Sequence, residues 1–161
     1  MPAWGEFTVA QARHLLSGRA NALIVGPVVW TAINGTWRGR VECLAANMPG
    51  CAVVLEIQVR PSRPSEPTVV LNLNGSLCRR VDVNGVHRLG PRLERWTHVQ
   101  GRDSSDEPDR LMPDPPGWFP HVPFDPVVTP DAYHQVFVAA ARLFQIETSG
   151  LNWDDPPEEA P

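Results

Sequence analysis

Two stretches decide the fold of this chain: Cys51-Ala-Val-Val-Leu-Glu-Ile-Gln-Val-Arg60 and, after a proline-rich break, Thr68-Val-Val-Leu-Asn-Leu-Asn-Gly-Ser-Leu-Cys-Arg-Arg-Val-Asp-Val-Asn-Gly-Val-His-Arg88. Apolar residues alternate with other residues along both stretches. They are Val53, Leu55, Ile57, Val59, Val69, Leu71, Leu73, Leu77, Val81 and Val83. A period of two over runs of this length predicts half-buried β-strands.

Three Asn-Gly pairs punctuate the apolar runs, at Asn34-Gly35, Asn74-Gly75 and Asn84-Gly85. A two-residue type I′ turn needs a positive φ at both central residues, which asparagine and glycine tolerate well. Each pair therefore predicts a tight hairpin, and together they predict an antiparallel meander. The segment from Pro61 to Pro67 contains prolines and no other apolar residue, so we expect a loop there.

A helix is predicted on each side of the strands. Thr8 and Gln11 have the spacing of a capping box, and Ser17-Gly18 ends this first helix. Thr129 is the expected N-cap of the second helix, with Pro130 at its first position. The second helix has an apolar stripe made of Tyr133, Val136, Phe137, Ala140, Leu143 and Phe144.

These elements predict an α+β fold with one twisted antiparallel sheet of about five to seven strands and both helices packed on one face. We expect a single domain over residues 1–150 and a mobile, acidic, proline-rich tail over residues 151–161. The expected core consists of Leu15, Leu16, Val53, Leu55, Ile57, Val59, Leu71, Leu73, Val81, Phe137, Ala140 and Phe144.

The composition excludes several classes of protein. The chain has no long apolar run and no basic, apolar leader, so we expect a cytoplasmic protein without a membrane segment. Its three cysteines, Cys43, Cys51 and Cys78, lack the spacing of a zinc site and fit small apolar residues in a reducing compartment. All fourteen basic residues are arginine, which excludes a catalytic or P-loop lysine.

The net charge of −4 is unevenly distributed along the chain. Residues 1–102 contain twelve arginines and six acidic residues, whereas residues 103–161 contain two arginines and twelve acidic residues. Two interpretations follow. Either the acidic part folds across a basic sheet and neutralises it, or the basic face stays free for an anionic partner.

Six arginines within one short stretch form the predicted nucleic-acid or anion-binding cluster. They are Arg79, Arg80, Arg88, Arg92, Arg95 and Arg102. Strict alternation places Arg79 on the apolar face of its strand. There it either extends its guanidinium to solvent or lies in a concave site that binds a carboxylate or phosphate.

His98 lies within this cluster, in the segment Arg95-Trp-Thr-His98. A histidine beside arginines suits acid–base catalysis of phosphodiester cleavage, so His98 and Arg95 are the candidate catalytic residues. A hydrogen-bonded structural histidine fits the same pattern. A divalent metal on His98, Asp103, Asp106 and His121 is a further alternative, although the preferred prediction has neither metal nor cofactor.

The long proline-rich loop over residues 101–128 contains aromatic residues as well as charged ones. This mixture predicts a segment that wraps the domain in extended form. Trp118, Phe119 and Phe124 are therefore the candidate anchors for a protein partner.

Several local features together resemble a known family. They are the meander, Thr97-His98-Val99-Gln100, the loop segment Pro120-His121-Val122-Pro123-Phe124 and Phe144-Gln-Ile146 in the last helix. Over roughly residues 50–147 this arrangement resembles small bacterial α+β proteins found near mobile elements and toxin–antitoxin pairs, loosely the TumE-like toxins. Those proteins tend to carry Thr-His-x-His, and Gln100 replaces the second histidine here.

Three functions stay open from the sequence. The lack of a complete catalytic set favours a small bacterial or phage accessory protein that binds a protein or RNA without catalysis, in a defence or toxin–antitoxin context. The first alternative is a toxin-like ribonuclease that uses His98 with the arginine cluster. The second is a self-assembling structural protein, which would associate through an exposed sheet edge.

Overall fold

The computed structural model describes residues 6–89, 92–102, 109–124, 128–129 and 131–161. Its elements in chain order are α1 (Val9–Leu16), β1 (Ala22–Ile33), β2 (Thr36–Ala45), β3 (Val53–Arg60), β4 (Arg63–Leu73), β5 (Ser76–Leu89), β6 (Arg92–Gly101), β7 (Arg110–Leu111), α2 (Ala132–Leu143), β8 (Ile146–Glu147) and β9 (Leu151–Asn152). Within these ranges, neither helix has the length and apolar character needed to cross a membrane.

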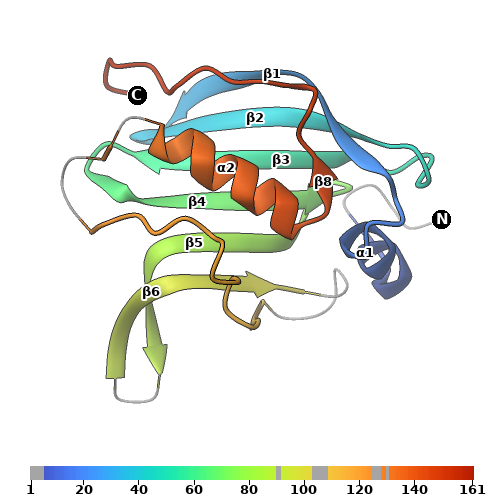
Figure 1. Ribbon diagram of the computed structural model, residues 1–161, viewed down its shortest axis with the longest axis horizontal. Coiled ribbons are helices and arrows are strands. Elements are labelled where there is room, and N and C mark those ends of the chain that lie inside the picture. The colour runs from blue at the N-terminus through green and yellow to red at the C-terminus, as the bar shows by residue number, and fades with distance from the viewer. Residues whose placement is uncertain (1–5, 90–91, 103–108, 125–127, 130) are drawn as a thin grey trace.

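The strands form a nine-stranded sheet in the order β7-β6-β5-β4-β3-β2-β1-β8, with β9 also paired to β1 (Figure 1). All neighbours from β7 to β1 are antiparallel, whereas β8 and β9 run parallel to β1. The predicted α+β class and antiparallel meander are confirmed. The strand number exceeds the predicted five to seven because β7, β8 and β9 are two-residue strands with no periodicity to detect.

The two helices occupy different places on the sheet, unlike the predicted pair on one face. Helix α2 crosses the middle of one face (Figure 1). Its own residues Val136, Phe137 and Ala140 are buried. Helix α1 lies beyond the strand ends, where Gln11 Nε2 is 3.5 Å from the Sγ of Cys51. With eight residues, α1 has too small an apolar face to cover several strands, so it closes the end of the sheet.

Two of the three predicted Asn-Gly hairpins are confirmed. Asn34-Gly35 joins β1 to β2 and Asn74-Gly75 joins β4 to β5, with φ of 50°, 74°, 53° and 84° in chain order. The predicted capping box of α1 is also present. The Thr8 and Gln11 side chains each accept from the other residue's backbone N–H, at 3.1 and 2.9 Å.

The prediction of a third hairpin at Asn84-Gly85 is wrong, because these residues lie inside β5. The pairing with β6 continues on both sides, but its register shifts between Asp82 and Gly85, which defines a bulge. Asn84 has a φ of 52°, and its amide donates to the carbonyls of Ser65 and Val122 at 2.9 and 2.7 Å. Asparagine and glycine are favoured in β-bulges as well as in hairpin turns, so an Asn-Gly pair alone does not distinguish a bulge from a turn.

The predicted loop from Pro61 to Pro67 is mostly strand. The turn is short, because Arg60 and Arg63 already pair across β3 and β4. The pairing then shifts register before Thr68 meets Gln58, and this break takes up the prolines, which have no N–H to donate. The start of the last helix also differs from expectation, since Asp131 is the N-cap in place of Thr129.

The core lies between α2 and the sheet. Eleven of the twelve predicted core residues are buried, and Leu16 is partly buried against the same cluster. The largest fully buried side chains include Phe137, Phe144 and Leu55. Because burying one such side chain contributes about 1.5–3 kcal/mol, this one-sided core stabilises the whole sheet.

The C-terminal tail lies against the sheet. Trp153 packs on Trp30 and Phe137 with ring centroids 5.8 and 5.3 Å apart, and the Trp30 and Trp37 indoles donate to backbone carbonyls of Asp154 and Glu159. These contacts describe the tail's position, and its predicted mobility stays a prediction. In the part of the chain that the structure describes, no carboxylate of residues 151–161 pairs with an arginine, whereas Asp109, from the start of the acidic part, lies 3.2 Å from Arg80.

Candidate functional site

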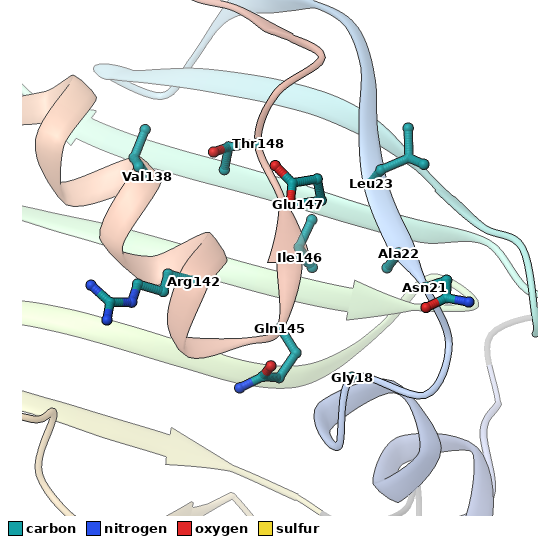
Figure 2. A pocket seen from close by; sticks show the side chains of 10 residues that line it. All are labelled: Gly18, Asn21, Ala22, Leu23, Val138, Arg142, Gln145, Ile146, Glu147 and Thr148. Atoms are coloured by element: carbon teal, nitrogen blue, oxygen red, sulfur yellow. The ribbon is translucent and has the colours of Figure 1, made fainter.

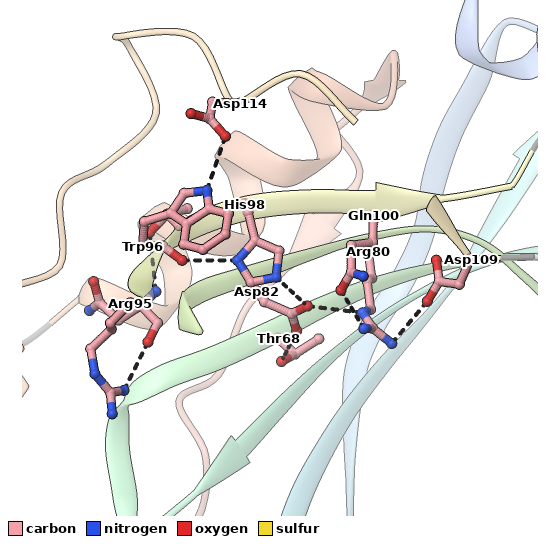
Figure 3. A network of polar contacts seen from close by, with 11 residues as sticks. Thr68, Arg80, Asp82, Arg95, Trp96, His98, Gln100, Asp109 and Asp114 are labelled. Carbon is pink, nitrogen blue, oxygen red and sulfur yellow. Dashed lines mark hydrogen bonds and ion pairs between the residues drawn. The ribbon is translucent and has the colours of Figure 1, made fainter. Parts of the chain in front are cut away.

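A polar row crosses the face of the sheet opposite α2. Thr68 on β4, Asp82 on β5 and His98 on β6 lie directly opposite one another in the sheet register. Opposite residues of antiparallel strands project to the same side, so these three side chains converge (Figure 3). We call the surface that carries them the open face.

His98 engages both of its ring nitrogens. Nδ1 donates to the backbone carbonyl of Trp96 at 3.0 Å, and Nε2 is 3.4 Å from Oδ2 of Asp82. The side chain is only 3% exposed. Gly85 makes room for it, because a Cβ at that position would lie 2.9 Å from Cε1 of His98. The imidazole is thus a buried, doubly bonded group.

The surroundings of His98 and Asp82 favour their charged forms. Burial alone would lower the pKa of His98, but the hydrogen bonds to Asp82 and Trp96 and the charge of Asp82 outweigh it, so this pKa is raised. Burial alone would raise the pKa of Asp82, but the His98 hydrogen bond, the Arg80 charge and the Thr68 hydrogen bond lower it. Each partner therefore holds the other ionised.

Arg80 has three partners on the open face (Figure 3). Its Nε donates to Asp82 at 2.9 Å, one terminal nitrogen lies 3.2 Å from Asp109, and the other donates to Gln100. A guanidinium has five N–H donors in a planar fork, and three directions of this fork are in use. Arg80 thus completes the buried network with His98 and Asp82, and its charge is compensated.

Arg95 connects the network to the proline-rich segment. Its guanidinium forms an ion pair with Glu66, donates to the Asn84 carbonyl at 2.9 Å and lies 4.1 Å from the centroid of the Phe124 ring. Glu66 is 8% exposed, and the ion pair with Arg95 compensates the charge of its carboxylate. Arg95 therefore fixes both a buried acid and an exposed aromatic ring.

Two adjoining pockets open beside the network. The first has a volume of 300 Å³ and is polar; its lining is Arg60, Arg63, Glu66, Thr68, Arg80, Asp82, Val83, Gly85, Val86, His98 and Gln100. The second has a volume of 580 Å³, and its lining is Ser62, Arg63, Pro64, Ser65, Glu66, Val86, Arg95 and Phe124. Arg63, Glu66 and Val86 line both, so the two pockets adjoin along these side chains.

The predicted arginine cluster is divided between the two faces of the sheet. Arg79 lies opposite Leu71, on the α2 side, and its guanidinium donates to the carbonyls of Cys78 and Arg102 at 2.9 and 2.6 Å. Arg80 and Arg95 join His98 in the network on the open face. The side chains of Arg88 and Arg92 lie outside the described part of the structure.

The three predicted aromatic anchors differ in exposure. Trp118 is 42% and Phe124 is 62% exposed, whereas Phe119 packs partly buried against the core. Trp118 borders a 420 Å³ groove over α2, lined also by Pro120, Asp131, His134, Gln135, Val138, Ala139 and Arg142. Trp118 and Phe124 are therefore the ones available to a partner.

The metal alternative gains no support from the geometry, whereas the three free cysteines are buried or partly buried, as expected of small apolar residues. No group of three potential metal ligands occurs among residues 6–89, 92–102, 109–124, 128–129 and 131–161, and Asp103 and Asp106 fall outside these ranges. Burial raises the pKa of Cys43 to about 12, which keeps its thiol protonated and unreactive.

Arg60 and Arg63 are site residues that were not predicted from the sequence. They flank the two-residue turn between β3 and β4 and line the polar pocket. The only signal available was their position on either side of Pro61-Ser62. Once that segment is interpreted as a loop, this signal is lost, because the two arginines then have no defined spacing.

A further pocket of 610 Å³ lies where the end of α2 meets β8, β1 and the turn after α1 (Figure 2). Its charged lining residues are Arg142 and Glu147. Backbone turns supply much of its wall, at Gly18, Asn21 and Gln145, all of which have a positive φ. Arg142 and Glu147 are its two charged lining residues, whereas the polar pocket of the open face is lined by Arg60, Arg63, Glu66, Arg80, Asp82 and His98, so the open face is the stronger candidate.

Comparison with known proteins adds no further identification. The chain matches no known protein family, no curated protein and no solved structure. The resemblance to TumE-like toxins therefore stays a prediction.

Proposed function

We propose that this protein acts without catalysis, by binding another protein through the segment 118–124. One observation carries the proposal. Trp118 and Phe124 are exposed, and an arginine guanidinium lies over each ring, Arg142 at 4.2 Å and Arg95 at 4.1 Å. Exposed aromatic rings that are already held in place resemble the anchor residues of protein interfaces.

The cation–π contacts lower the entropic cost of binding. A free tryptophan or phenylalanine side chain loses rotamer freedom when a partner covers it, which opposes association. Arg142 and Arg95 restrict the Trp118 and Phe124 rings before any partner arrives. The partner then gains the burial of large apolar rings at a reduced cost.

The space next to each ring suits an apolar side chain of the partner. Trp118 borders the 420 Å³ groove on the outer side of α2, together with Val138 and Ala139. Phe124 borders the 580 Å³ pocket with Pro64 and Val86. Two concave sites, each with an aromatic wall, favour a partner that inserts side chains at two points.

The alternative ribonuclease receives less support from the site. A general base must present an unprotonated nitrogen to its substrate. In His98 both nitrogens already have partners, and the ring is buried. Arg80, the arginine nearest to it in the network, is engaged by two carboxylates and an amide.

A quantitative pull-down tests the proposed function. Immobilised wild-type protein and a Trp118→Ala/Phe124→Ala variant are incubated with a lysate of cells that produce the protein, and captured proteins are compared by mass spectrometry. Leu44→Ala is the matched control, because Leu44 is 55% exposed on β2, away from the segment. We expect a partner to be retained by the wild type and the control and lost by the double variant.

Three other outcomes would contradict this proposal or support one of the alternative functions. Equal capture by all three proteins would mean that the aromatic segment is no binding surface. Cleavage of single-stranded RNA that disappears in His98→Ala would establish the ribonuclease. Mass that rises with concentration in light scattering would favour self-assembly.

A further inference from the structure

The strand pair β3–β4 ends in an uncompensated pair of positive charges. Arg60 and Arg63 lie directly opposite each other in the antiparallel register. Like charges in directly opposite positions repel each other and destabilise a sheet. The Arg60–Arg63 pair therefore lowers the stability of the strand pair unless an anion binds between the two side chains.

Among the residues that the structure describes, no carboxylate forms an ion pair with either arginine. Neither Arg60 nor Arg63 forms an ion pair or side-chain hydrogen bond within the described residues. The acids of the adjacent pocket are already compensated. Glu66 is bound by Arg95, and Asp82 is bound by Arg80 and His98.

A further uncompensated arginine lies on the same face. Arg38 of β2 is opposite Gln58, and Gln58 is opposite Thr68 of the polar pocket, so all three share the open face. The Nε of Arg38 is buried and has no hydrogen-bond partner among residues 6–89 or the other described ranges. The positive potential at this end of the sheet is therefore larger than that of Arg60 and Arg63 alone.

The charge of the pair identifies the ligand class. Two free guanidinium groups carry two positive charges, whereas a carboxylate or a phosphodiester neutralises only one. A phosphate monoester carries about −1.5 to −2 near pH 7 and offers three acceptor oxygens. Its oxygens can accept from two guanidinium forks at the same time, which a planar carboxylate does less well.

The adjoining pocket has room for the organic part of such a ligand. Arg63 borders both pockets, so a phosphate bound to it lies at their junction. Val86, 43% exposed, and Pro64 give the 580 Å³ pocket apolar walls. We propose that Arg60 and Arg63 form a binding site for a small phosphate monoester, with the phosphate between the two guanidinium groups. The phosphate contacts use none of the residues of the protein-binding segment proposed above, but the organic part of the ligand would share the 580 Å³ pocket with a partner side chain at Phe124, so ligand and partner would compete there.

Calorimetric titration of the full chain tests this site. The probes are inorganic phosphate, adenosine monophosphate, adenosine and a dinucleoside monophosphate, which contains a phosphodiester alone. We expect the two probes with a dianionic phosphate to bind and adenosine not to bind. The phosphodiester should bind at least about tenfold more weakly than adenosine monophosphate, because one charge interaction is lost.

Variants assign the binding to the two arginines. Arg60→Gln/Arg63→Gln should weaken phosphate and adenosine monophosphate binding by about tenfold or more. Arg40→Gln is the matched control and should leave binding unchanged, since Arg40 is an exposed arginine of β2 that already pairs with Glu42 at 3.6 Å. Thermal unfolding of each variant without ligand verifies that it is folded.

Four results would overturn the proposal. They are no binding of either dianionic phosphate probe to the wild type, equal binding to the double variant, an equal loss in Arg40→Gln, and the phosphodiester binding as tightly as adenosine monophosphate. Tighter binding of adenosine monophosphate than of inorganic phosphate would indicate that the organic part occupies the adjoining pocket. Equal affinities for adenosine monophosphate and inorganic phosphate would indicate that the site contacts the phosphate group alone.

Discussion

Asp82 and His98 lie directly opposite each other on β5 and β6, and the Nε2 of His98 is 3.4 Å from Oδ2 of Asp82. The pair is mostly buried, yet both members favour their charged forms because each compensates the other. Removing one member of such a pair leaves an uncompensated charge in a poorly solvated place, which typically costs about 3–5 kcal/mol. The main role of the pair is therefore to stabilise the open face.

The stability of the protein should depend on pH through this pair. The raised pKa of His98 adds stability that is fully present below its ordinary value of about 6.5 and is lost as the pH rises through the raised pKa. The lowered pKa of Asp82 adds stability that is present above about 3.9 and is lost as the pH falls through the lowered pKa. The advantage of the wild type over His98→Gln should thus be largest between about pH 4 and 6.5.

Urea unfolding of the two proteins from pH 3 to 9 measures this difference. The control is His121→Gln, since His121 is exposed and is not among the hydrogen-bond or ion-pair partners of the network. A difference between wild type and His98→Gln that stays constant over the whole range would contradict the assigned charges.

Gly85 should tolerate no larger residue. A Cβ there would lie 2.9 Å from Cε1 of His98 and 2.9 Å from Cβ of Asp82, both in a buried place. Gly85→Ala should therefore lower the free energy of unfolding by about 1–3 kcal/mol, the usual cost of overpacking. Gly117→Ala is the control, because nothing lies within 4 Å of its added Cβ. Equal effects of both substitutions in chemical denaturation would show that the close approach at Gly85 is unimportant.

Removing one charge of the Arg60–Arg63 pair should stabilise the protein. The two arginines lie opposite each other without an acidic partner in the described chain, so Arg60→Gln relieves repulsion of about 0.2–1 kcal/mol. The gain in melting temperature should shrink at high salt, since both side chains are exposed and their repulsion is screened. A lower melting temperature at low salt would mean that the arginines stabilise the hairpin in another way.

Trp153 should anchor the C-terminal tail. Its ring stacks on His134 with centroids 5.2 Å apart and contacts Trp30 and Phe137. Trp153→Ala should lower stability by about 2 kcal/mol and speed proteolytic removal of residues 154–161. Trp118→Ala, which changes an exposed ring elsewhere, should leave the cleavage rate unchanged. Rapid cleavage of the wild-type tail would support the mobility expected from its composition.

The regular part of the fold was predictable from the sequence. Alternation along β3 and β4 identified the buried side chains Leu55, Ile57 and Leu71. The capping box at Thr8 and the turn at Asn74-Gly75 are local, since neighbouring backbone groups decide them. Features of this kind need no knowledge of the rest of the chain.

The site was predictable only in part, because its form depends on pairing between distant residues. His98, Arg80 and Arg95 were identified as candidates from their positions in one basic stretch. Their partners Asp82, Glu66 and Asp109 were not, since the sheet register and the bulge at Asn84 bring them together. Because of these acidic partners, the charges of Arg80, Arg95 and His98 are compensated within the protein.

The pairing of β8 and β9 with β1 has a practical consequence for handling this protein. These two short strands bond to residues 22–23 and 26–27 of β1, so the chain's own end covers part of an edge strand. Unpaired strand edges are templates for association with other chains. Truncation before residue 146 would uncover these backbone groups and promote precipitation.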